Sequence, residues 1–275
     1  MNDDYTVTFA CYNQLDYTKE FIQSLDRDEV NFSRIVAVDN GSTDGTPDWL
    51  QSQGFGHVIL NKKNLGCGVA WNQGILVNQS KWTVIMNNDV VCARGWLRNL
   101  IDQAESNHLK IASPAMIEGV LSYGLPELTK EAIEKMAGYY RSGTAHAVCM
   151  AIHRDVWNDI GYFMPIPKLF GYEDAIFFKR CFEQNIKMGV VGSAWLHHYG
   201  MTTQKALRLE KHLATAQSLG DRDLMKTLLG DSWLERKLYK LRLKWAGRVD
   251  KTRELEKFGM TVHGVQIDNQ TVQWR

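Results

Sequence analysis

Three clusters of polar residues follow short apolar runs, and they are the best candidates for chemistry in this sequence. They read VDNGSTDGT at residues 38–46, IMNNDV at 85–90 and YED at 172–174. In the first cluster, small residues let the backbone turn tightly and present N–H groups, while Asp39 offers carboxylate oxygens to a base or a ribose. An Asx-rich turn without a ligand is the competing interpretation.

The second cluster supplies oxygen ligands of the kind that Mg²⁺ or Mn²⁺ prefers. Asp89 provides a hard carboxylate for an ion that carries substrate phosphates, and Asn87 provides a weaker amide oxygen. Asp89 also lies just ahead of the helical pattern RGWLRNLIDQA, so a helix N-cap is the alternative.

The third cluster is a pair of acids, Glu173 and Asp174, followed further along by His197 and His198. Paired acids placed in different surroundings can take different roles, one as a base and one as a structural group. The alternative is again structural, because acids at the start of a helix are stabilised by its dipole.

The elements that must position these clusters alternate between two periodicities. β-rich runs at residues 5–11, 34–38, 57–61 and 82–86 each precede a stretch with helical spacing. This alternation predicts βαβ units and an α/β fold with a mostly parallel sheet, whose sites lie at the carboxyl ends of the strands.

Composition indicates an ordinary globular protein. With 275 residues, 44% of them hydrophobic and 23% charged, the chain is unlike disordered, coiled-coil or collagen-like sequences. Its five cysteines are odd in number and widely spaced, which argues against a disulfide framework and favours a cytoplasmic location. The sequence shows neither a signal-peptide pattern nor an apolar run of membrane-spanning length, so we expect neither secretion nor a membrane span.

A change of pattern near Thr203 predicts a body over residues 1–203 and a basic helical extension over residues 204–275. The extension holds 15 basic and 9 acidic residues, although the whole chain has a net charge of only +1. One helix in it carries an apolar stripe formed by Leu234, Leu238, Leu241 and Trp245. Three roles fit this helix: packing on the body, peripheral contact with anionic lipid near a lipid-linked acceptor, and phosphate contacts to a nucleic-acid acceptor.

The order of these motifs resembles that of family 2 glycosyltransferases with the GT-A fold, including the rhamnosyltransferases and O-antigen-type enzymes. The resemblance runs over about residues 5–203 and includes the segment NLGCGVAWNQGI between the first and second clusters. It implies a GT-A catalytic domain with a mixed, mostly parallel sheet flanked by helices. It also implies inverting transfer of a sugar from a nucleoside diphosphate sugar, with a UDP-sugar expected, to an acceptor hydroxyl.

The same resemblance implies roles for particular residues. The aspartate that matches Asp39 binds the nucleobase, the one that matches Asp89 holds Mn²⁺ or Mg²⁺ on the diphosphate, and the one that matches Asp174 is the general base beside Glu173. A histidine that matches His197 completes the metal site. The remaining donor-binding positions are Ala10, Tyr12, Asn64, Asn72 and Asn88.

The sequence departs from the family in three places. It has no proline at the end of the first strand, its metal motif is NND with a single aspartate, and two histidines stand side by side, of which His197 has the better spacing to Gly200. A glycan, a lipid-linked saccharide or another polymer, nucleic acid included, fits the acceptor role.

Two other functions compete with glycosyl transfer. The thin metal motif favours a sugar-nucleotide or glycan-binding module on a degenerate GT-A scaffold, whereas the intact YED motif favours an enzyme. A nucleotidyltransferase would also place a carboxylate-bound metal at the end of an α/β sheet, but the sequence has no glycine-rich, lysine-bearing phosphate loop near its N-terminus.

Overall fold

The apolar runs predicted to be strands form the centre of a single sheet in the computed structural model of the protein. The structure describes residues 4–26, 29–77, 80–166, 173–200, 227, 230, 232–268 and 271–275. Its strands are β1 (Tyr5–Cys11), β2 (Ile35–Asp39), β3 (His57–Leu60), β4 (Trp82–Asn87), β5 (Val90–Cys92), β6 (Ile111–Glu118), β7 (Tyr140–Ser142), β8 (Cys149–His153), β9 (Met188–His198), β10 (His263–Gln266) and β11 (Val272–Trp274). Its helices are α1 (Leu15–Ser24), α2 (Thr46–Gln51), α3 (Cys67–Val77), α4 (Trp96–Ser106), α5 (Leu125–Lys135), α6 (Arg154–Ile160), α7 (Glu173–Glu183) and α10 (Trp233–Phe258).

The sheet is mixed, with a parallel half that carries the first two clusters. Its main path runs β11-β10-β6-β8-β4-β1-β2-β3, and β5 and β7 pair with β9, which lies beside β6. β3, β2, β1 and β4 are parallel to one another, whereas β8 is antiparallel to both β4 and β6. Cys11 pairs with Asp39 and Ala10 with Asn87, so the carboxyl ends of three strands lie level. The predicted α/β fold is confirmed.

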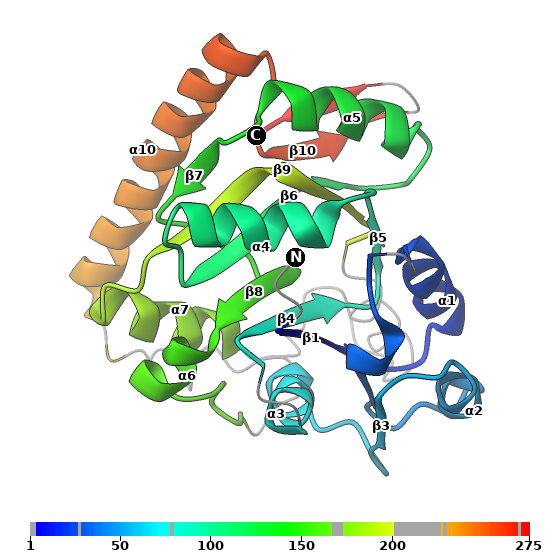
Figure 1. Ribbon diagram of the computed structural model, residues 1–275. Coiled ribbons are helices and arrows are strands. Elements are labelled where there is room, and N and C mark those ends of the chain that lie inside the picture. Colours follow the sequence, from blue (N-terminus) through cyan, green and yellow to red (C-terminus); the bar gives the residue numbers. More distant parts are fainter. Residues whose placement is uncertain are drawn as a thin grey trace.

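Helices cover both faces of the sheet, as Figure 1 shows. Alternate residues of the central strands point to opposite faces, so Val84 and Met86 pack with α1, α2 and α4 while Ile85 packs with α3, α6 and α7. The fit is closest at Gly74, where an added Cβ would lie 1.8 Å from the Thr8 hydroxyl of β1. A glycine is therefore needed there to bring α3 against the sheet.

The C-terminal segment is built into the same sheet. α10 runs along one side of the molecule in Figure 1, and the chain after it returns to form β10 and β11. β10 pairs with β6 in parallel, and β11 pairs with β10 in antiparallel fashion. The extension thus contains two strands besides its helix. The boundary predicted near Thr203 lies outside the described residues.

Glu254 fixes the end of α10 to the body. Its fully buried carboxylate accepts hydrogen bonds from the Tyr139 hydroxyl at 2.8 Å and from two nitrogens of Arg141 at 2.8 and 2.6 Å. It also accepts one from the backbone N–H of Val262 at 3.0 Å, just before β10. A buried carboxylate with this many donors joins α10, β7 and β10 into one unit.

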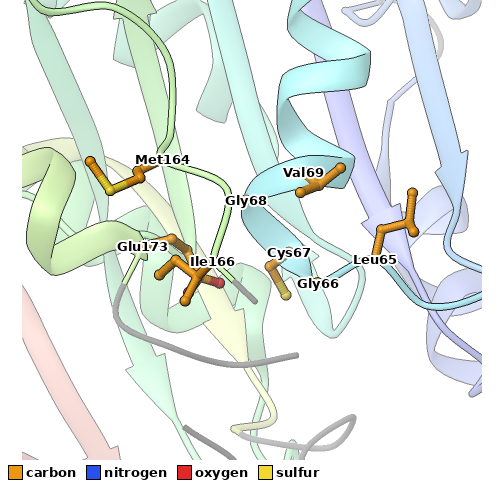
Figure 2. A pocket seen from close by; sticks show the side chains of 8 residues that line it. All are labelled: Leu65, Gly66, Cys67, Gly68, Val69, Met164, Ile166 and Glu173. Carbon is orange, nitrogen blue, oxygen red and sulfur yellow. The ribbon is translucent and has the colours of Figure 1, made fainter. Parts of the chain in front are cut away.

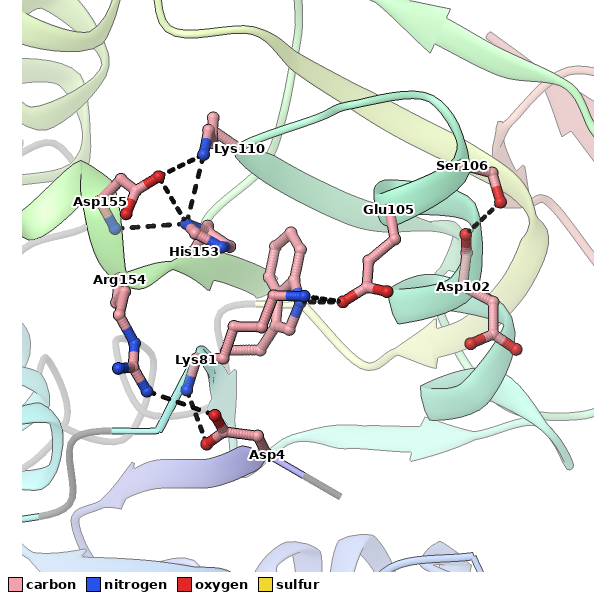
Figure 3. A network of polar contacts seen from close by, with 10 residues as sticks. Asp4, Lys81, Asp102, Glu105, Ser106, Lys110, His153, Arg154 and Asp155 are labelled. Carbon is pink, nitrogen blue, oxygen red and sulfur yellow. Dashed lines mark hydrogen bonds and ion pairs between the residues drawn. The ribbon is translucent and has the colours of Figure 1, made fainter. Parts of the chain in front are cut away.

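A polar network lies at the opposite end of the sheet from the predicted site (Figure 3). Lys81 and the Trp82 indole both donate to Glu105, at 2.6 and 3.0 Å, and Lys110 pairs with Asp155. These groups are partly exposed and pair with one another at the start of β4 and β6. Within the described part of the chain, no helix has both the length and the apolar character that crossing a membrane requires.

Candidate active site

Asp39 ends β2 with its side chain almost fully buried and organises the turn that follows. Its Oδ2 accepts hydrogen bonds from the backbone N–H groups of Gly41 and Ser42, at 3.1 and 3.0 Å. Its Oδ1 lies 4.0 Å from the Cys11 thiol at the end of β1. One carboxylate oxygen thus shapes the Asx turn that the sequence suggested as an alternative, and the other faces the gap between two strand ends.

The same turn holds the loop after β1, which contains Tyr12. The N–H of Asn13 donates to the Ser42 hydroxyl at 2.7 Å, and the Asn13 side chain accepts from the N–H of Thr43 at 2.8 Å. Asn13 has a positive φ of 52°, a strained conformation for a residue with a side chain. Ala10 is half-buried next to α3 and Tyr12 is half-buried in this loop. The residues predicted to flank the nucleobase therefore stand on a rigid base.

A network of side-chain amides ties this turn to the loop before α3. Asn40 donates to Asn64 at 3.0 Å and accepts from Asn61 at 3.2 Å and from the Leu65 N–H at 3.0 Å. Asn64 also accepts from the N–H of Gly66 at 2.9 Å. Asn64 therefore helps to shape the loop that precedes α3. The Asn40 side chain forms more hydrogen bonds in this network than any of the predicted site residues. Its surrounding sequence is that of an ordinary turn, so the sequence did not single it out.

Asn72, predicted to bind the donor, forms hydrogen bonds to the backbone of Phe163. Its amide nitrogen donates to the carbonyl of Phe163 at 2.7 Å, and its oxygen accepts from the N–H of the same residue at 3.1 Å. Asn72 thus fixes the segment that leads toward α7. Asn88, in turn, is buried and donates to the Thr18 hydroxyl at 2.9 Å, which holds α1.

Asp89 lies between β4 and β5, buried and close to a histidine. The pairing of β5 with β9 sets Val90 opposite His198, and the Nε2 atom of His198 is 3.4 Å from Oδ1 of Asp89. The histidine beside Asp89 is therefore His198, whereas the sequence analysis selected His197. Successive side chains of a strand point to opposite faces, so only one of the two can face Asp89.

His197 points into the core on the other face and has partners at both ring nitrogens. Its Nε2 donates to the carbonyl of Gly119 at 3.0 Å, and its Nδ1 accepts from the Tyr123 hydroxyl at 3.0 Å. Burial lowers the pKa of His197 to about 4, so the ring is neutral in this arrangement. Both ring nitrogens of His197 thus have partners within the protein.

His198 has the opposite electrostatic setting. Burial disfavours its charged form, but hydrogen bonds and charges from Asp89 and Glu118 outweigh burial and raise the pKa of His198 to about 9. Hydrogen bonds from His198 and His263 in turn hold the pKa of Glu118 well below its usual range. Two carboxylates therefore flank one imidazole at the carboxyl end of the sheet.

A small, half-open hollow lies between the start of α3 and the start of α7 (Figure 2). Its lining residues are Leu65, Gly66, Cys67, Gly68, Val69, Met164, Ile166 and Glu173. α3 approaches α7 closely at Gly68, where an added Cβ would lie 3.2 Å from Cβ of Glu173. Glu173 is buried, and Asp174 is half-buried with its Oδ1 accepting from the N–H of Ala175 at 2.8 Å. Tyr172 of the YED motif lies outside the described residues.

Cys67 shows that the metal and base candidates share one region. Burial raises the pKa of its thiol well above the usual range, and the charges of Glu173, Asp89 and Asp174 raise it further. Charges from the second and third clusters thus both act on the thiol at the start of α3. Negative charge gathers here, which suits a bound cation.

Comparisons with known proteins agree with this geometry. Residues 6–121 match the family model described as "Glycosyl transferase family 2". The resemblance to family 2 glycosyltransferases is thereby confirmed for this part of the chain. The matched segment contains Asp39, Asp89 and the amide network, whereas α7 and β9 lie beyond it. No curated protein sequence matches the chain.

Solved glycosyltransferase structures share the fold at low sequence identity. Residues 1–349 of S. aureus TarS match with a TM-score of 0.55 and 18% identity, over 75% of this chain and 64% of that one. GalNAc-T7 with UDP, GalNAc and Mn²⁺ matches with a TM-score of 0.53 and 12% identity, over 71% of this chain and 43% of that one. The mannosyltransferase PcManGT from Pyrobaculum calidifontis, with GDP-Man and Mn²⁺, matches with a TM-score of 0.54 and 17% identity, over 76% of this chain and 60% of that one. The chain thus spans less than two thirds of the length of each of these proteins.

Three contributors to the site were not singled out from the sequence. Asn40, Glu118 and His263 all form side-chain contacts within or beside it. Asn40 lies within the first motif, whereas Glu118 and His263 are single residues on strands that only the sheet topology brings together.

Proposed function

We propose that this protein is a metal-dependent, inverting glycosyltransferase that uses a UDP-sugar and transfers the sugar to an acceptor hydroxyl. The observation that carries the proposal is the Asp89–His198 pair, placed at the same edge of the sheet as Asp39 within a family 2 fold. UDP is preferred because TarS has been solved with UDP-GlcNAc and GalNAc-T7 with UDP, whereas PcManGT holds GDP-Man.

The residues present fit a divalent ion that is shared with a substrate diphosphate. Asp89 offers a carboxylate oxygen, and His198 offers Nε2, 3.4 Å away, once the ion displaces the proton that Asp89 and Glu118 stabilise on the ring. Both side chains are buried at the strand ends. Mn²⁺ and Mg²⁺ are often held by one or two protein ligands together with phosphate oxygens. When bound, the ion would neutralise the charge that grows on the leaving diphosphate.

The acceptor base in this proposal is Asp174. Direct inversion needs a single base on the acceptor side and no covalent intermediate. Asp174 begins α7 beside the hollow, and its backbone hydrogen bond to Ala175 uses only one carboxylate oxygen, Oδ1. Glu173, which lines the hollow, acts in positioning.

A donor-hydrolysis assay tests the function without knowledge of the acceptor. Purified protein is incubated with a panel of UDP-, GDP- and dTDP-sugars, with Mn²⁺ or with EDTA, and release of the nucleotide is measured. We expect hydrolysis of a UDP-sugar that requires Mn²⁺ and is lost in Asp89→Ala. An Asp102→Ala variant on α4 is a suitable control. Equal hydrolysis with Mn²⁺ and EDTA would remove the metal from the proposal.

A sugar-nucleotide-binding module is the second candidate. It is favoured by one observation: in the part of the chain that the structure describes, no three His, Cys, Asp or Glu residues gather into a ready metal-binding group. Such a module would bind a UDP-sugar in calorimetry yet release no nucleotide and transfer no sugar to any acceptor.

The exposed face of α10 suggests where the acceptor resides. Leu234, Leu238 and Leu241 are 57%, 50% and 55% exposed, and Trp245 is 69% exposed. These residues recur at helical spacing, so they form one apolar stripe on the outer side of α10. The packing role considered for this stripe would require buried side chains.

Charge favours an anionic lipid surface as the partner of this stripe. Residues 233–249 include six Lys and Arg but a single acid, Glu235. Two copies of this helix would repel one another, whereas an apolar stripe with basic flanks suits the interface of an anionic bilayer. A lipid-linked saccharide is therefore the acceptor class we favour.

Vesicle flotation tests this assignment with full-length protein. We expect binding to phosphatidylcholine vesicles that contain phosphatidylglycerol, no binding to phosphatidylcholine alone, and release by salt. The double variant Leu238→Gln/Leu241→Gln should lose binding, and the matched control Leu60→Gln/Leu76→Gln, at exposed leucines elsewhere, should keep it. Self-association that the first pair abolishes would instead identify a second copy as the partner. Binding of nucleic acid but not of vesicles would favour a nucleic-acid acceptor.

A further inference from the structure

Four strands that are distant in sequence line up side by side next to the candidate metal site. β9 lies between β5 and β6, with His198 opposite Val90 on one side and opposite Glu118 on the other. β10 then extends the sheet beyond β6, where Val265 lies opposite Glu118. The C-terminal segment thus reaches a point two strands away from His198.

Side chains form a continuous chain of contacts across these strands. Asp89 Oδ1 is 3.4 Å from His198 Nε2, and His198 Nδ1 is 3.5 Å from Glu118 Oε1. The other oxygen of Glu118 accepts from Nε2 of His263 at 3.0 Å and lies 3.9 Å from Nη1 of Arg275. Each ring nitrogen of His198 therefore faces a carboxylate.

We propose that Glu118 and His263 are positioning residues that hold His198 toward the metal shared with the donor diphosphate. A histidine that ligates a metal commonly donates its other ring N–H to a carboxylate, which fixes the ring and its tautomer. Glu118 is the carboxylate on the Nδ1 side, 3.5 Å away and without a hydrogen bond to that atom in this structure, and Nε2 faces Asp89.

Glu118 needs support of its own, and the C-terminal strands provide it. Its side chain is partly exposed, at 31%, so it would otherwise adopt several rotamers. The backbone of His263 is itself fixed, because its carbonyl accepts from the Thr261 hydroxyl at 2.7 Å and from the N–H of Arg275 at 2.8 Å. The β10–β11 hairpin therefore belongs to the functional site.

Mn²⁺ affinity is the measurement that tests this role. It is determined by electron paramagnetic resonance of free Mn²⁺ in the presence of UDP, and each variant is also melted. We expect Glu118→Gln and His263→Ala to weaken Mn²⁺ binding by about 10–100-fold, the usual effect of losing such support. His263→Gln should restore part of the affinity, because its amide can still donate to Glu118. The control Glu105→Gln, a carboxylate paired with Lys81 at the other end of the sheet, should not change it.

The outcomes separate this inference from the proposed function on which it rests. If wild-type protein binds UDP and Mn²⁺ and both test variants bind them equally well, the positioning role is overturned and the function stands. The positioning role is also overturned if the variants lower the melting temperature but leave Mn²⁺ affinity unchanged. Wild-type protein that binds UDP but not Mn²⁺ overturns both the positioning role and the metal. Failure to bind any nucleotide sugar overturns the function itself.

Discussion

Asn72 binds both backbone groups of Phe163, its amide nitrogen donating to the carbonyl at 2.7 Å and its oxygen accepting from the N–H at 3.1 Å. This pair of hydrogen bonds connects α3 to the segment that continues toward the hollow and Glu173. Phe163 is buried and stacks on Phe177 of α7 at 4.4 Å between ring centroids. One amide side chain therefore ties α3 to the segment that leads toward α7.

Replacement of Asn72 by Asp should weaken this link between α3 and the segment that contains Phe163. The carboxylate keeps the acceptor but faces the Phe163 carbonyl with a second oxygen, so a hydrogen bond becomes a repulsion. We expect about 1–3 kcal/mol less stability in urea unfolding. The transfer rate should fall as well. Asn158→Asp, at an exposed position on α6, is the control and should change neither. Unaltered unfolding of the Asn72 variant would show that the contact is weak.

Asp39→Asn should weaken UDP binding more than it weakens the fold. An amide oxygen can still accept from the N–H groups of Gly41 and Ser42, but the charge offered to the nucleoside is lost. A hydrogen bond to a charged group contributes about 1.5–3 kcal/mol, so the dissociation constant in calorimetry should rise at least tenfold. The exposed Asp48→Asn on α2 serves as the control. UDP affinity equal to that of the wild type would remove Asp39 from the donor site.

Asp174→Asn should lower the turnover number by about 10²–10⁴, the usual contribution of a general base. Donor affinity should be nearly unchanged, since the substitution is almost isosteric and keeps an oxygen for the N–H of Ala175. Glu173→Gln should act mainly on stability. A normal turnover in Asp174→Asn together with a loss in Glu173→Gln would exchange the two roles.

Gly68→Ala should disturb the hollow at its narrowest point. The new methyl group would lie 3.2 Å from Cβ and 3.4 Å from Cγ of Glu173, so α3 and α7 must move apart slightly. We expect a reduced transfer rate and a lower melting temperature. Gly247→Ala on α10, where an added Cβ meets no atom within 4 Å, should instead stabilise the protein by up to about 1 kcal/mol. If Gly68→Ala transfers sugar normally, the hollow is not part of the acceptor site.

His146 makes the fold sensitive to acid. Burial lowers its pKa to about 4, its hydrogen bond to the Pro114 carbonyl opposes this effect, and the charges of His263 and His198 add to it, with Glu118 opposing. The unfolded chain, with an ordinary pKa of about 6.5, therefore binds the proton first as pH falls. The free energy of unfolding should decrease from about pH 6.5 toward pH 4. In His146→Gln the free energy of unfolding should decrease less over this pH range. A pH profile identical to that of the wild type would contradict the role given to His146.

The sequence predicted the sheet and the position of the clusters better than the partners of each side chain. Apolar runs followed by helical spacing were enough to predict β1, β2 and β4 with Asp39 and Asp89 at their ends, because local periodicity determines these elements. The choice between His197 and His198 depends instead on which face of β9 meets β5. That register is a long-range property, and spacing to Gly200 carries no information about it.

The amide network shows the same division. NGSTDG predicts a turn, but the bonds from Asn40 to Asn61 and Asn64 require the loop after β3 to return beside it. Likewise, the extension was predicted as helical from the pattern after Gly200 and the apolar stripe from Leu234 to Trp245, whereas the short strand β10 is held by pairing with β6, and β11 by pairing with β10. Strands of this length depend on tertiary context.

The pairing of β10 with β6 also bears on how the protein must be handled. Residues 116–118 lie along the outer side of β6, and β10 is what satisfies their backbone N–H and carbonyl groups there. A chain cut before residue 261 would leave these groups open as an unprotected sheet edge, which is a template for pairing with another chain. Such shortened forms should aggregate on expression, so inactivity of a truncated protein would report exposed backbone and would say nothing about catalysis.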